Sequence, residues 1–194
     1  LHAWWQKFGL GLPTGIDLPF EAEGRLPSVQ AKEVATGEPW RLGDTYNVSI
    51  GQGDLLLTPI QLLNYVSAIA NKGKMYRPFI ASGLRAPEVI ADLSGAASEM
   101  QEVAKGMIAT TKHPEGTAYS LRNLPFTVAA KTGTAQVVSK TQENALFVGY
   151  APAENPQIAI LVLIENSREG SVNTIPIAKD VLNWYYWNRI KNSK

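Results

Sequence analysis

Four consecutive residues, Lys131-Thr132-Gly133-Thr134, have the types and the spacing to act on a peptide-like ligand. A lysine at such a position sets the local electrostatic field and can hold a neighbouring hydroxyl in hydrogen-bonding geometry. Threonine hydroxyls can receive a carboxylate, and glycine lets an extended backbone lie close because it has no Cβ. A backbone N–H just beyond the glycine can help to bind an oxyanion, a contribution of about 3 kcal/mol in enzymes where such a donor was removed.

The two pairs in this motif differ in the face that they occupy on an extended strand. Alternation places Thr132 and Thr134 on one face, and Lys131 and Gly133 on the other. Both pairs can serve one site only if the strand forms the lip of a cleft, so the motif predicts an edge strand. For the four residues alone, a surface strand that happens to contain lysine and threonine is an equally good interpretation.

A lysine in such a motif assists a serine nucleophile, which is expected in a Ser-x-x-Lys motif, and the sequence contains no such motif. No serine lies three residues before any lysine, and Ser28 and Lys32 are four residues apart. Residues 171–173 have the form Ser-x-Asn, but they follow the Lys131 motif, and we interpret them as a loop coincidence. Gly-x-Ser-x-Gly, Walker A and His-Glu-x-x-His motifs are absent. We infer that the nucleophile lies outside this chain.

Metal and cofactor chemistry finds little support, and we expect neither a metal nor a cofactor. His2 and His113 have no convincing ligand spacing, and His113 precedes a proline, which favours a turn position. Asp17, Glu21 and Glu23 could suggest a cation site, but three carboxylates in a polar loop are usually solvated.

Composition limits the class of protein and the class of partner. The 194 residues are 45% hydrophobic, with 18 basic and 17 acidic side chains, which suits one ordinary globular domain with no nucleic-acid partner. The absence of cysteine excludes disulfides and thiolate chemistry. The longest apolar run, residues 158–164, is far too short for a membrane span. The chain opens on Leu1 without a signal peptide, so we expect it to be a piece of a longer protein.

The elements that must position the motif follow a loop, helix, sheet and helix order. Residues 8–28 predict an ordered loop rich in glycine and proline, and residues 29–53 predict further irregular structure. A helix is expected over residues 59–71, with Thr58 as its N-cap and Gly73 closing it. A second helix is expected over residues 99–111, capped by Ser98, with an apolar side formed by Met100, Val103, Met107 and Ile108.

After Pro125 the pattern predicts an antiparallel sheet and a closing helix. Residues 126–138, 145–152 and 157–166 are three β-rich runs with short connections, and the third is apolar enough to be covered on both faces. Residues 174–190 predict an amphipathic helix whose tryptophans pack in the core. Its expected apolar stripe is Ile177, Val181, Trp184 and Trp187 or Tyr185. The predicted fold class is α+β, an antiparallel sheet flanked by helices.

Several segments together resemble the transpeptidase domain of class B penicillin-binding proteins, most closely the penicillin-binding protein 2 type. The resemblance covers nearly the whole chain. It is carried by FGLGLPTGIDLPFEAEGRLP, GDTYNVSIGQGDLLLTPIQLLNYVSAIANKGKMYRP, EGTA, AAKTGTAQV, FVGYAP and the closing IPIA helix, in the family's order and at similar spacings. The resemblance implies a serine β-lactamase/D,D-transpeptidase-like fold, of which residues 1–194 would be the C-terminal portion of a single domain.

The resemblance also implies a reaction and a set of roles. A serine would acylate on a peptidoglycan stem peptide, expel the terminal D-Ala and pass the acyl group to an amine, while β-lactams would trap the acyl-enzyme. Lys131 would hydrogen-bond the serine of the missing Ser-x-Asn motif. Thr132 and Thr134 would hold the carboxylate, the N–H of Thr134 would form half of the oxyanion hole, and Gly133 would keep the strand clear.

Two positions depart from the family's pattern. Ala129-Ala130 stands where the family often has Ala-Gly, and a small side chain fits there. Residues 144–147, Asn-Ala-Leu-Phe, stand where the family often has His-Ala-Trp-Phe. A role for that histidine or tryptophan is therefore not transferred to this chain.

In this family Ser-x-x-Lys and Ser-x-Asn lie before the region that resembles residues 8–28. The chain would then hold one wall of the active site without its nucleophile, and alone it would be inactive. The parent would face the periplasm, anchored in the cytoplasmic membrane by an N-terminal helix. Its partners would be D-Ala-D-Ala stem peptides, β-lactams, the missing N-terminal half and a glycosyltransferase of the elongation complex.

Two other functions remain open from the sequence. The chain could be a non-catalytic module that binds D-Ala-terminated peptides reversibly and has lost the chemistry. It could also come from a related D,D-carboxypeptidase or β-lactamase. The long ordered loop and the Ile50-Gly51-Gln52-Gly53 segment favour a transpeptidase, but only through the resemblance.

Overall fold

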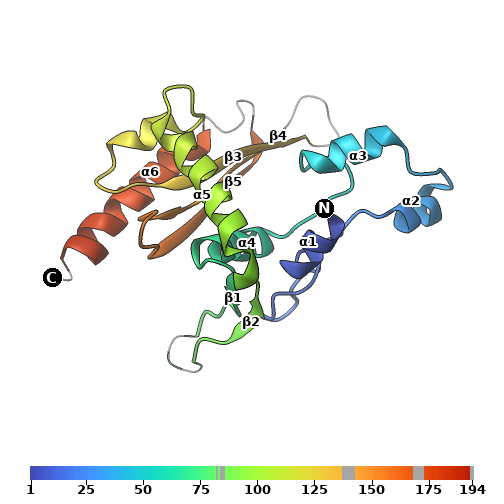
Figure 1. The fold of residues 1–194 in the computed structure, drawn as a ribbon, viewed down its shortest axis with the longest axis horizontal. Helices are drawn as coiled ribbons and strands as arrows, with labels where there is room; N and C mark the ends of the chain where they lie inside the picture. The colour runs from blue at the N-terminus through green and yellow to red at the C-terminus, as the bar shows by residue number, and fades with distance from the viewer. Residues whose placement is uncertain (82, 84–85, 137–142, 168–172, 193–194) are drawn as a thin grey trace. The chain divides into compact units, whose positions relative to one another are not determined.

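The computed structural model describes residues 1–81, 83, 86–136, 143–167 and 173–192. These residues group into two compact units, one formed by Leu1–Ala68 and Lys74–Leu93 and the other by Ile69–Gly73 and Ser94–Lys194. Figure 1 shows the helices and strands of each unit. No helix in the described part of the chain is both long and apolar enough to cross a membrane.

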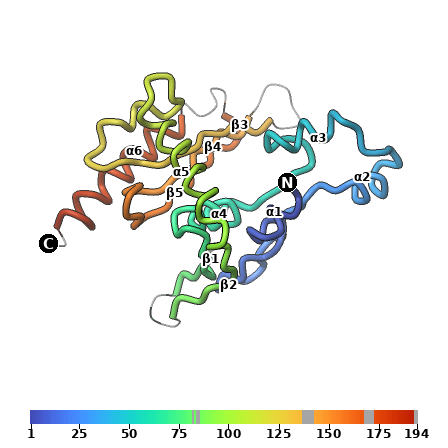
Figure 2. Tube along the Cα trace, in the orientation of Figure 1, coloured from blue at the N-terminus to red at the C-terminus, as the bar shows by residue number. Residues whose placement is uncertain are grey.

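In the described part of the chain, the first unit contains four helices, the last of which runs two residues into the second unit, and a small antiparallel pair of strands. The helices are α1 (His2–Lys7), α2 (Val29–Thr36), α3 (Leu42–Ser49) and α4 (Pro59–Ala70). Strands β1 (Lys74–Tyr76) and β2 (Val89–Asp92) pair antiparallel, as the trace in Figure 2 shows. Residues 8–28, expected to be a loop, contain no helix or extended strand and make one isolated bridge, Arg25 to Leu56.

The expectation of irregular structure over residues 29–53 was wrong, because α2 and α3 lie there. Ser28 Oγ accepts the N–H of Ala31 at 3.0 Å and caps α2, and Gly37 ends it in the left-handed region at φ 70°. Asp44 accepts the N–H of Arg41 at 2.6 Å and caps α3. Asp44 also pairs with Lys32 of α2 at 2.6 Å, which ties the two helices together.

Helix α4 begins at Pro59, as the sequence predicts, and ends at Ala70, one residue earlier than expected. Thr58 and Gln61 form a reciprocal capping box: Gln61 N donates to Thr58 Oγ1 at 3.3 Å, and Thr58 N donates to Gln61 Oε1 at 3.2 Å. Gln61 is 2% exposed, and its Nε2 donates to Leu12 O at 2.6 Å, which ties the helix to the loop. At the other end Lys72, not only Gly73, takes a positive φ.

The main segment of the second unit begins with the 3-10 turn η1 (Ser94–Ala96) and helix α5 (Ala97–Lys112). The prediction that Ser98 caps this helix was wrong, because the helix starts earlier, and the Ser98 hydroxyl donates to Glu99 at 2.6 Å. Met100, Met107 and Thr111 are its buried residues, whereas Val103 is exposed. The chain then passes through a tight turn and the 3-10 helix η2 (Tyr119–Asn123).

Three antiparallel strands form the sheet of this unit in the order β3 (Ala129–Gln136), β4 (Glu143–Ala151) and β5 (Ile158–Ser167). The predicted meander is therefore confirmed. The prediction that the third run is covered on both faces was wrong: β4, at the centre, carries the run of buried residues, whereas β5 at the edge is mostly half-buried. The apolar sequence of β5 did not reveal that, among the described strands, it pairs on one side only.

The core of this unit lies between the sheet, η2 and helix α6 (Thr174–Tyr185), which a π-helical turn, η4 (Tyr186–Lys191), continues. The expected stripe on α6 was wrong, because the opposite set, Thr174, Ile175, Ala178 and Leu182, is buried. Ile177, Val181, Trp184 and Trp187 are 41–54% exposed, so Trp184 and Trp187 are not core residues. The predicted class, an antiparallel sheet with helices packed against it, is confirmed.

Candidate functional site

The Lys131 motif lies on β3, and the described residues give this strand a neighbour on one side only. Lys131, Thr132, Gly133 and Thr134 pair with Val148, Phe147, Leu146 and Ala145 of β4. The prediction of an edge strand is confirmed. The other edge of β3 can accept an extended ligand, as in recognition by strand addition.

Exposure differs along the motif. Lys131 and Thr134 are exposed, Gly133 is half-buried, and Thr132 is only 6% exposed. The amine of Lys131 donates to the carbonyl oxygen of Thr132 at 2.5 Å, so the cation lies along its own strand. In an antiparallel ladder, residues two positions apart direct their backbone N–H and C=O groups toward the same edge of the strand. The backbone groups of Thr134 therefore point toward the same edge as those of Thr132.

The Thr132 hydroxyl has a side-chain partner on another segment. Thr132 Oγ1 lies 2.7 Å from Thr117 Oγ1, and either oxygen can be the donor. Thr117 belongs to the Glu-Gly-Thr-Ala segment between α5 and η2, and its side chain is exposed. The resemblance includes that segment but assigns Thr117 no role. Only its place in a tight turn after a helix could have drawn attention to it.

The turn that carries Thr117 is fixed on both sides. A Cβ on Gly116 would overlap the carbonyl group of Thr110, so only glycine lets the chain pass this close to the end of α5. Next to Thr117, Ala118 is fully buried, and its N–H donates to Thr110 O at 3.1 Å. His113 ends the helix and accepts the N–H of Glu115, which confirms its predicted turn position.

The strand itself is anchored at the end where it enters the sheet. The Thr111 hydroxyl of α5 donates to Val128 O at 2.7 Å, and both groups are buried. Ala129 and Ala130 are fully buried, and a Cβ on Gly149 would lie 2.5 Å from Ala129 O. Small residues therefore hold β3 and β4 in close register just before the motif begins.

This geometry unites the four predicted residues on one strand edge: a cation, two hydroxyls and a glycine. Such a set can bind a carboxylate through charge-assisted hydrogen bonds and receive an extended peptide alongside. It can stabilise negative charge but contains no nucleophile of its own. A nucleophilic group would have to come from elsewhere.

Of the two serines considered in the sequence, the structure describes only Ser28, and its hydroxyl is already engaged. Ser28 is the cap of α2, and Lys32 is paired with Asp44, so these two side chains do not act on each other. Ser171 lies outside the described residues, and Asn173 donates to Ser167 Oγ at 3.2 Å. The loop interpretation of residues 171–173 stays a prediction.

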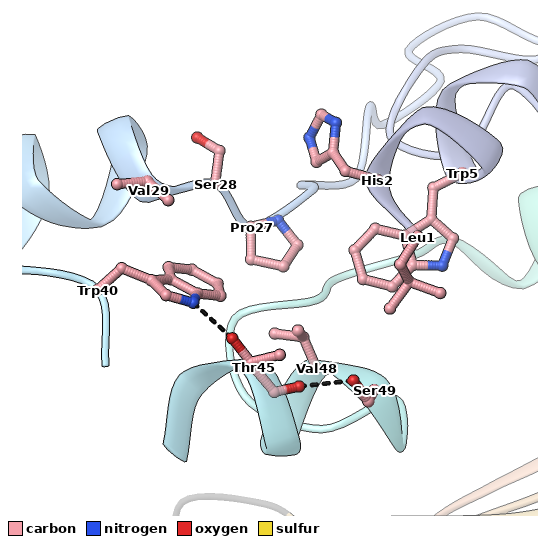
Figure 3. Close-up of a pocket in the computed structure, with 10 residues that line it drawn as sticks. All are labelled: Leu1, His2, Trp5, Pro27, Ser28, Val29, Trp40, Thr45, Val48 and Ser49. Carbon is pink, nitrogen blue, oxygen red and sulfur yellow. Dashed lines mark hydrogen bonds between the residues drawn. The ribbon is translucent and has the colours of Figure 1, made fainter. Parts of the chain in front are cut away.

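A cavity of about 400 Å³ lies in the first unit and is a second place to look for chemistry. Figure 3 shows its walls, which are formed mainly by apolar side chains of α1, α2 and α3, with Trp40 between α2 and α3. Its hydroxyls are used locally: Trp40 Nε1 donates to Thr45 Oγ1 at 2.8 Å, and Ser49 Oγ donates to Thr45 O at 2.7 Å. These contacts stabilise α3 and provide no reactive group.

Two carboxylates of the first loop, those of Glu21 and Asp17, are structural. The carboxylate of Glu21 accepts the hydroxyl and the N–H of Thr14 and the N–H of Gly15. Burial opposes its ionisation, but these hydrogen bonds outweigh that effect and lower the pKa of Glu21. Asp17 accepts the N–H groups of Ile80 and Ala81 at 2.7 and 3.0 Å. The expectation that these two carboxylates are merely solvated was wrong.

Comparison with known proteins finds a matching family and similar proteins. Residues 1–183 match the family described as penicillin binding protein transpeptidase domain. Peptidoglycan D,D-transpeptidase MrdA of Acinetobacter baumannii is 33% identical over 215 residues, which cover 99% of this chain and 32% of that protein. Penicillin-binding protein H of Bacillus subtilis is 31% identical, over 100% of this chain and 29% of its own length. The chain thus spans about a third of these curated relatives.

Solved structures agree with the sequence comparison. Penicillin-binding protein 2 from Helicobacter pylori matches 95% of this chain with a TM-score of 0.84 and 35% identity, over 35% of its own chain. Pseudomonas aeruginosa penicillin-binding protein 2, in complex with WCK 5153, matches the whole chain with a TM-score of 0.83 and 32% identity, over 44% of its own. The fold is the α+β fold of penicillin-binding transpeptidases.

Proposed function

The chain belongs to the penicillin-binding protein transpeptidase domain family, and from this premise we propose that its parent is a peptidoglycan D,D-transpeptidase of the penicillin-binding protein 2 type. Residues 1–194 form the C-terminal portion of its catalytic domain. The observation that carries the proposal is the Lys-Thr-Gly-Thr segment on the outer edge of β3, where a ligand strand can lie.

The proposed reaction has two acyl-transfer steps. A serine supplied by the parent attacks the carbonyl carbon of the penultimate D-Ala in a stem peptide, the C–N bond to the terminal D-Ala breaks, and D-Ala leaves as a free amine. An amine of a neighbouring stem then attacks the acyl-serine, which forms the cross-link and restores the serine. A β-lactam acylates the same serine, but its leaving group stays tethered.

Lys131 and Thr134 act on the reacting atoms in this proposal. Lys131 hydrogen-bonds the serine of a Ser-x-Asn motif in the parent and supports its proton transfers. Its exposed amine is held by one carbonyl, that of Thr132, and an ammonium has three N–H donors, so it can reach a second group. The N–H of Thr134 provides half of the oxyanion hole.

Thr132, Thr134 and Gly133 bind the substrate in this proposal. The two threonine hydroxyls receive the terminal carboxylate, with Thr134 exposed at the strand edge and Thr132 behind it. Gly133 leaves room for the peptide. Its own surroundings make no demand for glycine, because a Cβ would meet only Leu146 Cβ at 3.7 Å, an ordinary contact.

The setting of the parent is part of the same proposal. We expect its catalytic domain on the outer side of the cytoplasmic membrane, where stem peptides are cross-linked, held by a membrane anchor outside residues 1–194. Its partners would be stem peptides, β-lactams and a glycosyltransferase. One related structure is a complex of Helicobacter pylori penicillin-binding protein 2 with MreC, which supports a protein partner for the parent.

Intact-mass analysis with a penicillin tests the proposal. The parent protein should gain the mass of one penicillin on a serine outside residues 1–194, and the 194-residue chain of 21.1 kDa should gain none. Release of D-Ala from a stem peptide, with and without an acceptor amine, then separates cross-linking from carboxypeptidase activity. A parent that stays unmodified but binds D-Ala-terminated peptides would instead be a binding module.

A further inference from the structure

The hydrogen bond between Thr117 and Thr132 has no place in the function proposed so far. The two oxygens are 2.7 Å apart, although the residues lie 15 positions apart in the sequence. We propose that Thr117 is a positioning residue for substrate binding: its hydroxyl donates to Thr132 Oγ1 and turns the Thr132 O–H toward the substrate carboxylate. This inference rests on the proposed function.

The direction of this hydrogen bond decides what Thr132 can do. A threonine hydroxyl has one proton to donate and two lone pairs that accept. If Thr132 donates to Thr117, its only proton is used, and its oxygen repels a carboxylate. If Thr117 donates, Thr132 keeps its proton for the carboxylate. A bound carboxylate therefore favours the second arrangement, and the two hydroxyls polarise each other in series.

The turn around Thr117 provides the rigidity that this role requires. Gly116 passes against the Thr110 carbonyl, where no side chain fits, and Ala118 is fully buried with its N–H on the same carbonyl. Both neighbours of Thr117 are therefore fixed to the end of α5. Thr111 of that helix also holds β3 through Val128 O. One helix end thus sets the positions of both hydroxyls.

Because Thr132 is buried, loss of its hydrogen bond to Thr117 should affect it more than it would affect an exposed residue. Its side chain is 6% exposed, so water can compensate a lost partner only poorly. Thr134 is exposed at the strand edge and offers a second hydroxyl to the carboxylate. A loss of the Thr117 hydroxyl should therefore weaken carboxylate recognition while leaving the contribution of Thr134 intact.

The test is carried out in the parent protein with two probes, a penicillin and its carboxyl methyl ester. Thr117→Val removes the hydroxyl while keeping the shape, and Thr117→Ser keeps the hydroxyl. Thr117→Val should lower the second-order acylation rate constant for the penicillin about fivefold to tenfold, and that for the ester less than twofold. Thr117→Ser should stay within about threefold of the unmodified protein for both.

A matched control and a double variant keep the test decisive. Thr110→Val removes a hydroxyl that bonds Gly106 O on the same helix end, and it should leave the penicillin-to-ester ratio unchanged. In a Thr132→Val background, Thr117→Val should change that ratio no further. This comparison uses the ratio of two probes, so a partial loss of folded protein cancels from it.

Three results would overturn the inference: equal losses for penicillin and ester in Thr117→Val, no rescue by Thr117→Ser, or additive effects of the two valine substitutions. Any of these would give Thr117 a purely structural role. A different result, in which the unmodified parent is acylated by neither probe, would overturn the proposed function instead.

Discussion

At the residue scale, Gly133 and Gly149 lie in the same sheet but should respond differently to a methyl group. We expect Gly133→Ala to change the thermal midpoint of the parent domain little, because its Cβ would only touch Leu146 Cβ at 3.7 Å. Gly149→Ala should destabilise the domain by about 1–3 kcal/mol, because its Cβ would lie 2.5 Å from Ala129 O. Thermal unfolding of both variants measures the contrast.

Gly133→Ala should affect β-lactam acylation strongly, although it causes the smaller steric clash within the protein. If a substrate strand lies along β3, the methyl group of Gly133→Ala meets the ligand rather than the protein, and β-lactam acylation should fall at least tenfold. An acylation rate unchanged by Gly133→Ala would mean that no ligand approaches this edge closely.

Glu21 gives the first loop a defined dependence on pH. Hydrogen bonds from Thr14 and Gly15 lower the pKa of Glu21 below its ordinary value of 4.5 despite partial burial. A carboxyl with a lowered folded pKa stabilises the fold above its unfolded pKa, and that contribution is lost as the pH falls through the folded pKa.

Glu21→Gln should therefore lower the thermal midpoint of the parent domain at pH 7, and the deficit should shrink as the pH falls below about 4.5. Glu23→Gln is the control, because Glu23 lies two residues away in the same loop and is exposed. Parallel midpoint curves for the unmodified protein and Glu21→Gln between pH 7 and pH 3 would contradict this account.

At the element scale, two glycines near the end of α5 test how the turn around Thr117 is built. Gly116→Ala should destabilise the domain by more than about 2 kcal/mol, because the new methyl group overlaps the Thr110 carbonyl. Gly106→Ala should stabilise it by about 0.5–1 kcal/mol, because the position is helical and nothing lies within 4 Å. Chemical unfolding of both variants gives the two signs.

The elements show why sequence patterns predicted some features and not others. The three strands and α4 carry local signals, such as β-rich runs and Thr58 as an N-cap before a helix that starts at residue 59, and these predictions are confirmed. Helix α2 also has local helix signals, the Ser28 cap and Gly37 at its end. The helix was not predicted because its sequence is only weakly apolar and shows no clear apolar face.

The two faces of α6 could not be told apart from the sequence. Ile177, Val181 and Trp184 form as good an apolar stripe as Ile175, Ala178 and Leu182, and only packing against the sheet selects the second set. Thr117 was missed for a related reason. Its partner lies 15 residues away, and no local pattern encodes a hydrogen bond between two side chains on different elements.

At the scale of the whole molecule, the described residues leave much apolar surface open. Exposed large side chains occur in both units. Three of them on α6, Ile177, Val181 and Trp184, follow one another at helical spacing, and Trp187 continues the series on η4. The chain also spans only about a third of its curated relatives. We therefore expect the isolated 194 residues to aggregate or unfold broadly on heating, whereas a sharp two-state melt in dilute buffer would count against this view.

The exposed stripe on α6 allows a direct test of whether the remainder of the parent covers this face. The sequence contains no cysteine, so single cysteines report cleanly. Val181→Cys should react readily with a maleimide in the 194-residue chain and at least tenfold more slowly in the parent, because burying such apolar side chains stabilises by about 2 kcal/mol each.

Lys179→Cys is the matched control, since it lies two residues away on another side of the same helix and is exposed. Its labelling rate should be similar in the chain and in the parent. Protection of Val181→Cys that grows with protein concentration would instead identify a second copy as the covering surface. Equal reactivity of Val181→Cys in chain and parent would show that α6 faces solvent in the complete protein, and the stripe would then have to be explained without intramolecular packing.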